Sequence, residues 1–312
     1  MDLRQLRYFL TIVEQGSFSK AAATLNVAQP ALSLHVRNME AELGAALLFR
    51  GPRGVTPTEA GEILLRHARA IVDKFAVARD EIRGHDAAPS GEVRLGLPGT
   101  ISQILAVPLI IEARRRFPDI RLRVAEAMSG FVLDWLKELR IDLAVLYIPV
   151  EDRSLVSNAV LTETLWLLGP IASIGDLPQL APGAVGYAEI AKLPLILPSA
   201  SHGLRELLER EGADRKLALN TVIEVDSYAN IKGLVEAGLG YSILPFNSIA
   251  QEVQSGRLQT WRIAEPELTR DIHLVKPADR PVTRAVLTIE ALCRELLLDL
   301  AAKGKWSGAR AL

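Results

Sequence analysis

The apolar positions of the first 83 residues recur every three or four residues, which is the spacing of helices that bury one face. This pattern predicts helices over residues 3–14, 17–25, 29–43 and 58–83. Turn-forming residues end the first three helices: Gly16, Asn26 and Gly44. Two short apolar runs flank Gly51-Pro52-Arg53-Gly54, which predicts a small hairpin between residues 47 and 58.

The last of these helices carries a narrow apolar seam. Its apolar residues lie four, three, four, three and four positions apart: Leu64, Ala68, Ile71, Phe75, Ala78 and Ile82. Because this spacing is typical of coiled coils, we expect the helix to pair with the same helix of a second subunit. The alternative is that the seam packs on its own chain.

From residue 92 onwards, predicted strands alternate with predicted helices. The segment before them, GHDAAPSG at 84–91, has the composition of a hinge. The strands are EVRLGLP, IRLRVAEA, DLAVLYI, TLWLLGP, LPLILPS, NTVIEVD, GYSILP and IHLVKP, and the helices cover 101–117, 129–139, 203–211, 228–237 and 283–303. This alternation predicts parallel α/β sheets in two units of about 100 residues each.

The composition is that of an ordinary globular protein, with 312 residues of which 49% are hydrophobic and 23% charged. The net charge of -1 gives no general attraction to nucleic acid, so a basic binding surface has to be local. The single cysteine, Cys293, excludes a disulfide within the chain. The sequence has no signal peptide and no apolar run of about 18 residues, so we expect a cytoplasmic protein without a membrane span.

The helix predicted over 29–43 has two unlike faces. Its core stripe consists of Leu32, Val36, Met39 and Leu43. The opposite face is short-chained and polar at its N-terminal end, and it carries Gln29, Pro30, Ser33, Leu34 and Arg37. In a helix-turn-helix the second helix presents such residues to the major groove, where Gln suits adenine, Arg suits guanine and Ser suits either. Arg50 and Arg53 of the hairpin suit phosphate or minor-groove contacts.

Charge alone does not establish DNA binding. Residues 1–58 hold six basic and four acidic side chains, and six minus four leaves a surplus of two positive charges. On spacing and charge alone, the alternative is a three-helix domain whose polar face is simply solvated.

The stretch SFSKAAATLNVAQPALSLHVRNMEAELGAALLFRGPRGVTPTEAG resembles the winged helix-turn-helix of the LysR-type transcriptional regulators. The positions that carry the resemblance are Ser17-Phe18, Ala21-Ala22, Leu25, Gln29, Ala31, Ser33, Leu43-Gly44, Leu47, Arg50, Gly54-Val55, Thr58 and Ala60-Gly61. The chain departs from the family's pattern in three places. Ala28 stands where Ser is usual, Leu34 stands where Arg or another polar residue is usual, and Leu48-Phe49 stands where Phe and an acid are usual. These departures bear on which operator sequence is read.

The resemblance covers the whole chain. It implies an α/β protein with an all-α-type winged helix-turn-helix N-terminal domain and a C-terminal region of two doubly wound α/β subdomains, as in periplasmic binding proteins. The implied parts are a DNA-binding domain at 1–58, a dimerisation (linker) helix at 59–83, a hinge at 84–91, and an effector-binding domain at 92–303 with subdomain I at about 92–163 and 268–303 and subdomain II at about 164–267. Implied partners are double-stranded DNA, a small-molecule effector, a second subunit in a homodimer, a homotetramer and RNA polymerase.

Two segments of the C-terminal half combine a strand end, small residues and a helix start. They are LGLPGTIS, with Thr100 and Ser102, and LILPSASHGLR, with Ser199, Ser201 and His202. Because free N–H groups at helix N-termini favour anions, we expect a small anionic effector between them. The resemblance adds Ser129, and Asp226 and Phe246 lie in later loops that could close the cleft. The alternative for each hydroxyl is a simple helix cap.

This half also resembles the nitrogen-assimilation-control branch of the family, through LPLILPSASHGLRELLE and EVDSYANIKGLVEAGLGYSILP.

The residue patterns predict neither an enzyme nor a metal or cofactor site. The histidines are scattered without metal-ligand spacing: His35, His67, His85, His202 and His273. The glycines of GLPG do not form a dinucleotide fingerprint, and Cys293 lies in an apolar helix. Two alternatives remain open. One is an enzyme that uses the cleft, with His202 and Asp226 as an acid-base pair, and the other is a small-molecule receptor of the periplasmic type that has no DNA role.

Overall fold

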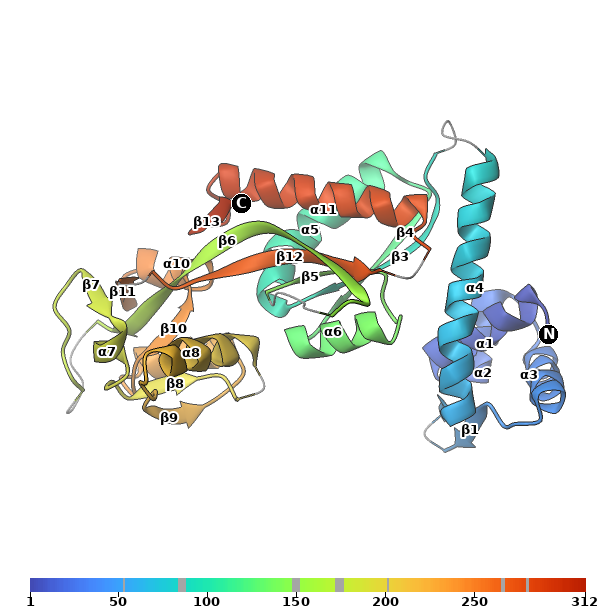
Figure 1. The fold of residues 1–312 in the computed structure, drawn as a ribbon, viewed down its shortest axis with the longest axis horizontal. Coiled ribbons are helices and arrows are strands. Elements are labelled where there is room, and N and C mark those ends of the chain that lie inside the picture. The colour runs from blue at the N-terminus through green and yellow to red at the C-terminus, as the bar shows by residue number, and fades with distance from the viewer. Residues whose placement is uncertain are drawn as a thin grey trace. The chain divides into compact units, whose positions relative to one another are not determined.

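The computed structural model describes residues 1–52, 54–83, 88–147, 152–171, 177–200, 202–264, 267–278 and 281–312. The chain groups into two compact units. The first unit comprises Met1–Pro89 with Asp279–Leu287, and the second comprises Ser90–Ala278 with Thr288–Leu312 (Figure 1).

The Met1–Pro89 part of the first unit contains four helices and one hairpin among its described residues. The helices are α1 (Leu3–Gln15), α2 (Phe18–Leu25), α3 (Gln29–Leu43) and α4 (Glu59–Arg83). The hairpin pairs β1 (Leu48–Gly51) with β2 (Gly54–Pro57) in antiparallel register. The predicted helices and the predicted hairpin are therefore confirmed, because their signals are local in sequence.

The helix ends follow from their capping residues. Asp2 and Gln5 form a capping box at the start of α1, and Ser17 caps α2 by accepting a hydrogen bond from the Lys20 N–H. Asn26 ends α2 in the left-handed conformation, with φ of 54°. Ala28, the N-cap residue of α3, has no side chain that can accept a hydrogen bond, so α3 begins without a side-chain cap.

Two glycines hold the hairpin and α4 against the rest of the first unit. Gly54 has φ of +117°, and a Cβ at this position would lie 2.6 Å from the carbonyl oxygen of Gly16. The next residue, Val55, donates its N–H to that same oxygen at 2.9 Å. A Cβ on Gly61 would collide with the carbonyl oxygen of Leu47. The glycines of the sequence motif thus allow close backbone contacts.

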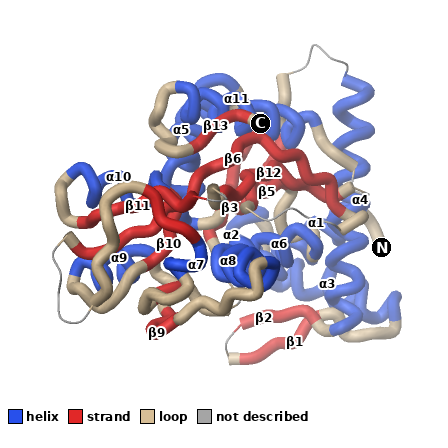
Figure 2. Tube along the Cα trace, turned by 60° about the vertical axis from the view of Figure 1, so that its left-hand side comes forward, coloured by secondary structure: helices blue, strands red, loops and turns tan. Residues whose placement is uncertain are grey.

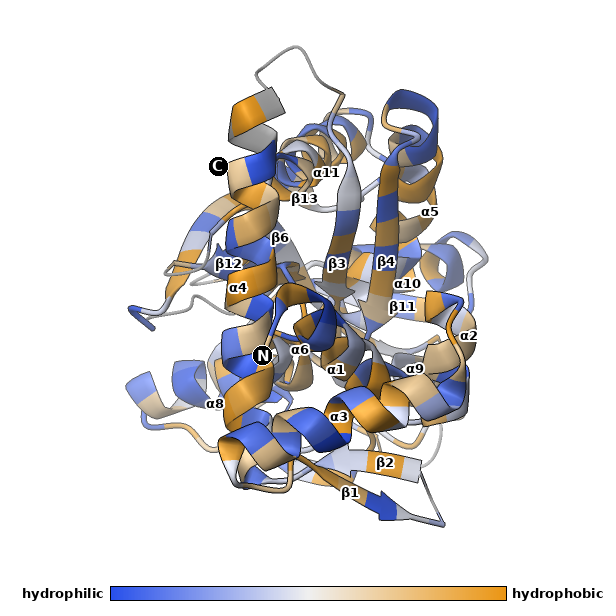
Figure 3. Ribbon diagram, turned by 90° about the vertical axis from the view of Figure 1, so that its right-hand side faces the viewer, coloured by the Kyte–Doolittle hydropathy of each residue, from blue (hydrophilic) through white to orange (hydrophobic). Residues whose placement is uncertain are grey.

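The apolar seam of α4 is buried at one end and exposed at the other. Leu64 and Ala68 belong to the core of the first unit. Ile71 is 47% exposed, Phe75 52% and Ile82 86%. Figure 3 shows apolar residues recurring along α4. The first half of the seam therefore packs on its own chain, and the exposed second half is available for pairing with a second subunit.

The second unit is built around a mixed sheet. Its path runs β4 (Ile120–Glu126), β3 (Gly91–Leu97), β5 (Leu143–Leu146), β12 (Thr269–Pro277), β6 (Leu155–Pro170), β11 (Leu258–Ala264) and β7 (Ala184–Gly186). β10 (Ser242–Pro245) and β13 (Ala309–Ala311) also pair with β6, and β8 (Leu195–Leu197) pairs separately with β9 (Thr221–Glu224).

The predicted α/β class is confirmed, but the sheet that was predicted to be parallel is mixed. β3 is parallel to β4 and β5, and β8 is parallel to β9. However, β12 is antiparallel to both β5 and β6, and β6 is antiparallel to β10, β11 and β13. The long strands β6 and β12 lie side by side and run through the middle of the unit (Figures 1 and 2). These pairings join segments far apart in the chain, which local patterns do not reveal.

Seven helices of the described chain accompany these strands. They are α5 (Gly99–Arg116), α6 (Ser129–Lys137), α7 (Tyr187–Ile190), α8 (Gly203–Asp214), α9 (Tyr228–Glu236), α10 (Phe246–Gln254) and α11 (Arg284–Ala302). The predicted helices at 101–117, 129–139, 203–211, 228–237 and 283–303 correspond to five of them, whereas α7 and α10 were not predicted. Of the predicted hinge at 84–91, residues 84–87 lie outside the described chain.

Candidate functional site

The N-terminal end of α3 is an open surface. Gln29, Pro30 and Arg37 are exposed, and Leu34 is 54% exposed. The opposite side of the helix is buried through Leu32, Val36 and Met39. The two faces predicted for this helix are therefore present, with an apolar Leu34 in the middle of the open one.

Ser33 does not lie on the open face as the sequence suggested. Its side chain is buried, with 7% exposed, and its hydroxyl accepts a hydrogen bond from Gln29 Nε2 at 3.0 Å. This contact engages the hydroxyl within the helix. Ser33 instead fixes the orientation of the exposed Gln29 amide.

Arg50 in β1 is held by two neighbours. Its guanidinium carbon lies 4.7 Å from the centre of the Phe18 ring, and Nη2 lies 3.9 Å from Glu40 Oε2. Glu40 in turn accepts the Leu47 N–H, so it joins the hairpin to α3. Arg53, the other predicted hairpin contact, lies outside the described residues.

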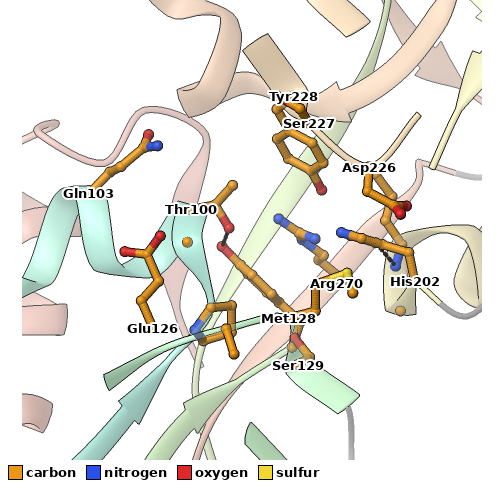
Figure 4. A pocket seen from close by; sticks show the side chains of 16 residues that line it. Thr100, Gln103, Glu126, Met128, Ser129, His202, Asp226, Ser227, Tyr228 and Arg270 are labelled. Carbon is orange, nitrogen blue, oxygen red and sulfur yellow. Dashed lines mark hydrogen bonds between the residues drawn. The ribbon is translucent and has the colours of Figure 1, made fainter. Parts of the chain in front are cut away.

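A cavity of about 350 Å³ opens in the second unit (Figure 4). Its lining residues come from the end of β4, from the N-terminal ends of α5, α6, α8 and α9, from the segment after β5, and from β12. The lining includes four predicted residues: Thr100, Ser129, His202 and Asp226. It also includes residues that sequence reasoning missed: Gln103, Glu126, Met128, Tyr147, Tyr228 and Arg270.

The helices at this cavity differ in how their first turns are satisfied. His202 caps α8 by accepting the Leu204 N–H, and Ser227 caps α9 by accepting the Asn230 N–H. The N-cap residues of α5 and α6 are Pro98 and Met128, which make no side-chain cap hydrogen bond. The first N–H groups of α5 and α6 are consequently open to an anion.

Arg270 is the cation of the cavity. It is 5% exposed, and its guanidinium carbon lies 3.4 Å from the centre of the Tyr147 ring. Arg270 Nε donates to Glu163 Oε1 at 2.6 Å, and these two residues are register partners in β12 and β6. Burial disfavours the charged form of Arg270 and lowers its pKa. Glu163 and the nearby tyrosines outweigh this effect and keep the pKa of Arg270 above its usual value. The guanidinium is therefore charged at the wall of the cavity.

Glu163 connects this arginine to the C-terminal segment of the chain. Its second oxygen, Oε2, accepts a hydrogen bond from the buried Trp306 indole at 2.8 Å. β13 follows Trp306 and pairs with β6 alongside Glu163. The orientation of the Arg270–Glu163 pair thus depends on a segment that lies outside the cavity.

His202 and Asp226 do not form an acid-base pair in this geometry. His202 Nδ1 accepts the Leu204 N–H at 3.1 Å, and its ring points toward Arg270 (Figure 4). Burial, with the positive charge of Arg270, lowers the pKa of His202 to about 4. Asp226 accepts hydrogen bonds from the Ser199 N–H and hydroxyl, which lower the pKa of its carboxyl. At neutral pH the cavity therefore presents a neutral imidazole and an ionised carboxylate.

Three predicted effector residues lie elsewhere than expected. Ser102 lies in the first turn of α5 but does not line the cavity, and Ser199 lies behind Asp226 as its hydrogen-bond donor. Phe246 begins α10 and packs on Trp166, with 4.9 Å between ring centres, instead of closing the cavity. Ser201 lies outside the described residues.

The described residues contain no cluster of three or more His, Cys, Asp or Glu side chains that could hold a metal ion. Cys293 is buried in α11, and this burial raises the pKa of its thiol, so it is a core residue. Within the described chain, no helix combines the length and the apolar character needed to span a bilayer.

Comparison with known proteins assigns both parts of the chain. Residues 3–62 match the family described as "Bacterial regulatory helix-turn-helix protein, lysR family", and residues 86–298 match the "LysR substrate binding domain". The chain belongs to the LysR family of transcriptional regulators. The resemblance of the N-terminal stretch to this family is thereby confirmed, and so is the prediction that the chain is a regulator and not an enzyme.

Relatives match this LysR-family chain over nearly its whole length. The nitrogen assimilation regulatory protein nac of Escherichia coli (strain K12) is 34% identical over 305 residues, which covers 96% of this chain and 95% of the relative. The regulator BbuR of Bordetella bronchiseptica is 29% identical over 308 residues, covering 99% and 94%. The match to nac confirms the predicted likeness to the nitrogen-assimilation branch, which now extends over both halves of the chain.

Solved structures show the same fold. A full-length OxyR variant from Pseudomonas aeruginosa superposes with a TM-score of 0.78 at 24% identity, covering 94% of this chain and 95% of that one. Full-length BenM superposes with a TM-score of 0.58 at 25% identity, covering 97% and 98%. LysR-family regulators combine a DNA-binding helix-turn-helix with an effector-binding domain, and they oligomerise.

Proposed function

We propose that this regulator reads its operator with the N-terminal end of α3 and contacts the DNA backbone beside it with the β1–β2 hairpin. The open face of α3 supports this proposal. It combines an amide held in place by Ser33, an apolar Leu34 and a guanidinium at Arg37. An oriented amide suits adenine, an apolar side chain suits a thymine methyl, and a guanidinium suits guanine. Arg50 and Arg53 contribute phosphate contacts.

We further propose that small-molecule binding at the Arg270 cavity controls this DNA binding. The first turns of α5 and α6 and the Arg270 guanidinium surround one space, which supports an effector that carries an anionic group. Thr100 and Ser129 lie at those first turns and supply hydroxyls.

The exposed half of the α4 seam supports a homodimer, and two such dimers form a homotetramer that contacts RNA polymerase.

The DNA-binding proposal is tested with Gln29→Ala and Arg50→Ala in the full-length protein. Binding to the operator, found by mapping bound genomic sites, is compared with binding to random DNA of equal length by mobility shift. Gln29→Ala should weaken operator binding by about tenfold or more and leave random DNA unchanged, because it removes a base contact. Arg50→Ala should weaken both alike, because it removes a phosphate contact.

Leu43→Ala serves as the control, since Leu43 lies at the far end of α3 from Gln29 and is 45% exposed there, although the sequence placed it in the core stripe. It should leave both affinities close to those of the unchanged protein. If Gln29→Ala binds the operator as tightly as the unchanged protein at low and high salt, α3 does not read the operator through this residue and the assignment is wrong.

A further inference from the structure

The ionised groups of the Arg270 cavity are arranged by sign. The guanidinium of Arg270 lies at the buried end, with 5% of the residue exposed. The two carboxylates that line the cavity, Glu126 and Asp226, are both exposed and lie nearer its mouth. Figure 4 shows Arg270 between them, with Glu126 on the α5 side and Asp226 on the α8 side. The cavity thus has a cationic floor and an anionic rim.

Arg270 lines the cavity, and Glu163 holds it from outside the lining. Arg270 Nε and Nη2 both lie 2.6 Å from Glu163 Oε1, and Glu163 is not among the residues that line the cavity. The open first turns of α5 and α6 face the same space. A carboxylate at this position would receive charge-assisted hydrogen bonds from the guanidinium and from backbone N–H groups.

The rim opposes an effector that is only an anion. Glu126, Asp226 and, behind the floor, Glu163 place three carboxylates around a single guanidinium. The imidazole of His202 adds no charge at neutral pH, because burial lowers its pKa to about 4. A plain carboxylate would therefore add negative charge to an already negative surround, whereas an ammonium group at the rim would be attracted.

Glu126 is the carboxylate that is free for such a contact. It makes no hydrogen bond or ion pair with the residues that the structure describes, and its side chain lies beside the start of α5, where a Cβ on Gly99 would be 3.2 Å from Glu126 Oε1. Asp226, in contrast, already accepts two hydrogen bonds from Ser199.

We propose that the effector is a zwitterion of the amino-acid class, whose carboxylate binds the Arg270 floor and whose ammonium group pairs with Glu126 at the rim. This inference rests on the proposed effector role of the cavity and adds the chemical class of the ligand. The cavity volume of about 350 Å³ suits a molecule of this size.

The test measures binding to the full-length protein by isothermal titration calorimetry. The probes are the twenty common L-amino acids, each paired with the acid that has the same carbon skeleton without the α-amino group. At least one amino acid should bind, and its desamino partner should bind about tenfold or more weakly, because the charged contact at the rim is lost.

Glu126→Gln then assigns the contact, with Glu189→Gln as a matched control at an exposed carboxylate outside the cavity. Glu126→Gln should weaken binding of the amino acid by about tenfold and leave the affinity for the desamino acid unchanged. Glu189→Gln should change neither affinity.

The outcomes separate the two proposals. If a desamino acid binds as tightly as its amino acid, the zwitterion inference is wrong, while the cavity keeps its role as the effector site. If neither series binds, both the zwitterion and the carboxylate-bearing effector are overturned, while the DNA-binding proposal is decided by the Gln29 experiment. If the amino acid binds Glu126→Gln and the unchanged protein equally, the assignment of its ammonium group to Glu126 is overturned.

Discussion

Arg270 and Glu163 show why the central charge of the cavity escapes sequence analysis. Each is flanked by polar residues, as TRD around Arg270 and TET around Glu163 show, and 107 positions separate them. Only the antiparallel pairing of β12 with β6 places them opposite each other. A buried charge is costly unless it is paired, so each of these residues needs the other. Their polar flanking residues give no sign in the sequence that either side chain is buried.

The lowered pKa of His202 predicts how the stability of the folded protein changes with pH. Its pKa of about 4 in the folded protein lies below the usual value of 6.5. As pH falls below about 6.5, the unfolded chain takes up a proton at this residue while the folded chain does not. The free energy of unfolding should therefore fall as pH falls from 6.5 toward 4, and His202 contributes to this loss.

His202→Asn removes that titration and keeps a side chain that can cap α8. Urea unfolding, followed by tryptophan fluorescence at pH 7 and pH 5, measures the difference. The unchanged protein should lose more stability between the two pH values than His202→Asn does. Equal losses would show that His202 takes up its proton equally well in the folded protein.

At the scale of elements, local signals predict helices well and sheets poorly. The helices of the first unit follow from apolar spacing and from end signals such as Ser17 and Gly16. In contrast, only the second half of β6 was predicted, as TLWLLGP, although β6 extends over Leu155–Pro170. β13 is three residues long and has the sequence ARA, which carries no strand signal of its own. Such strands exist because a distant partner satisfies their backbone groups.

The uncapped start of α3 gives a prediction for a single element. Ala28→Ser would place a hydroxyl beside the Ala31 N–H, which now donates to the Ala28 carbonyl at 3.0 Å, since Pro30 has no N–H to offer. The change should raise the free energy of unfolding of the first unit by about 1 kcal/mol, measured by urea unfolding. Ser17→Ala is the converse control, because Ser17 caps α2, and it should lower stability by about 1 kcal/mol. No gain from Ala28→Ser would show that the start of α3 cannot adopt capping geometry.

At the scale of the whole molecule, the proposed homodimer would bury apolar residues that one chain leaves exposed. Phe75 lies in the exposed half of the α4 seam. Phe75→Glu should convert the dimer to monomer in sedimentation velocity, because it would bury charge against apolar residues of the partner helix. Circular dichroism should show an unchanged helix content.

Lys74→Glu is the control for this assembly experiment, since it places a carboxylate next to the seam but not in it. It should leave the association unchanged. An unchanged sedimentation coefficient for Phe75→Glu would move the interface away from α4.

The burial of Cys293 has a practical consequence for spectroscopy. It is the single cysteine of the chain, it is fully buried in α11, and its thiol stays protonated because burial raises its pKa. Maleimide and methanethiosulfonate reagents react with accessible thiolates, so the native chain contributes little background labelling. Cysteines introduced at Val107 and Val222, which are 64% and 50% exposed, can then carry a spin-label pair. Distances between such labels would report in solution how the two sides of the cavity move when a ligand enters.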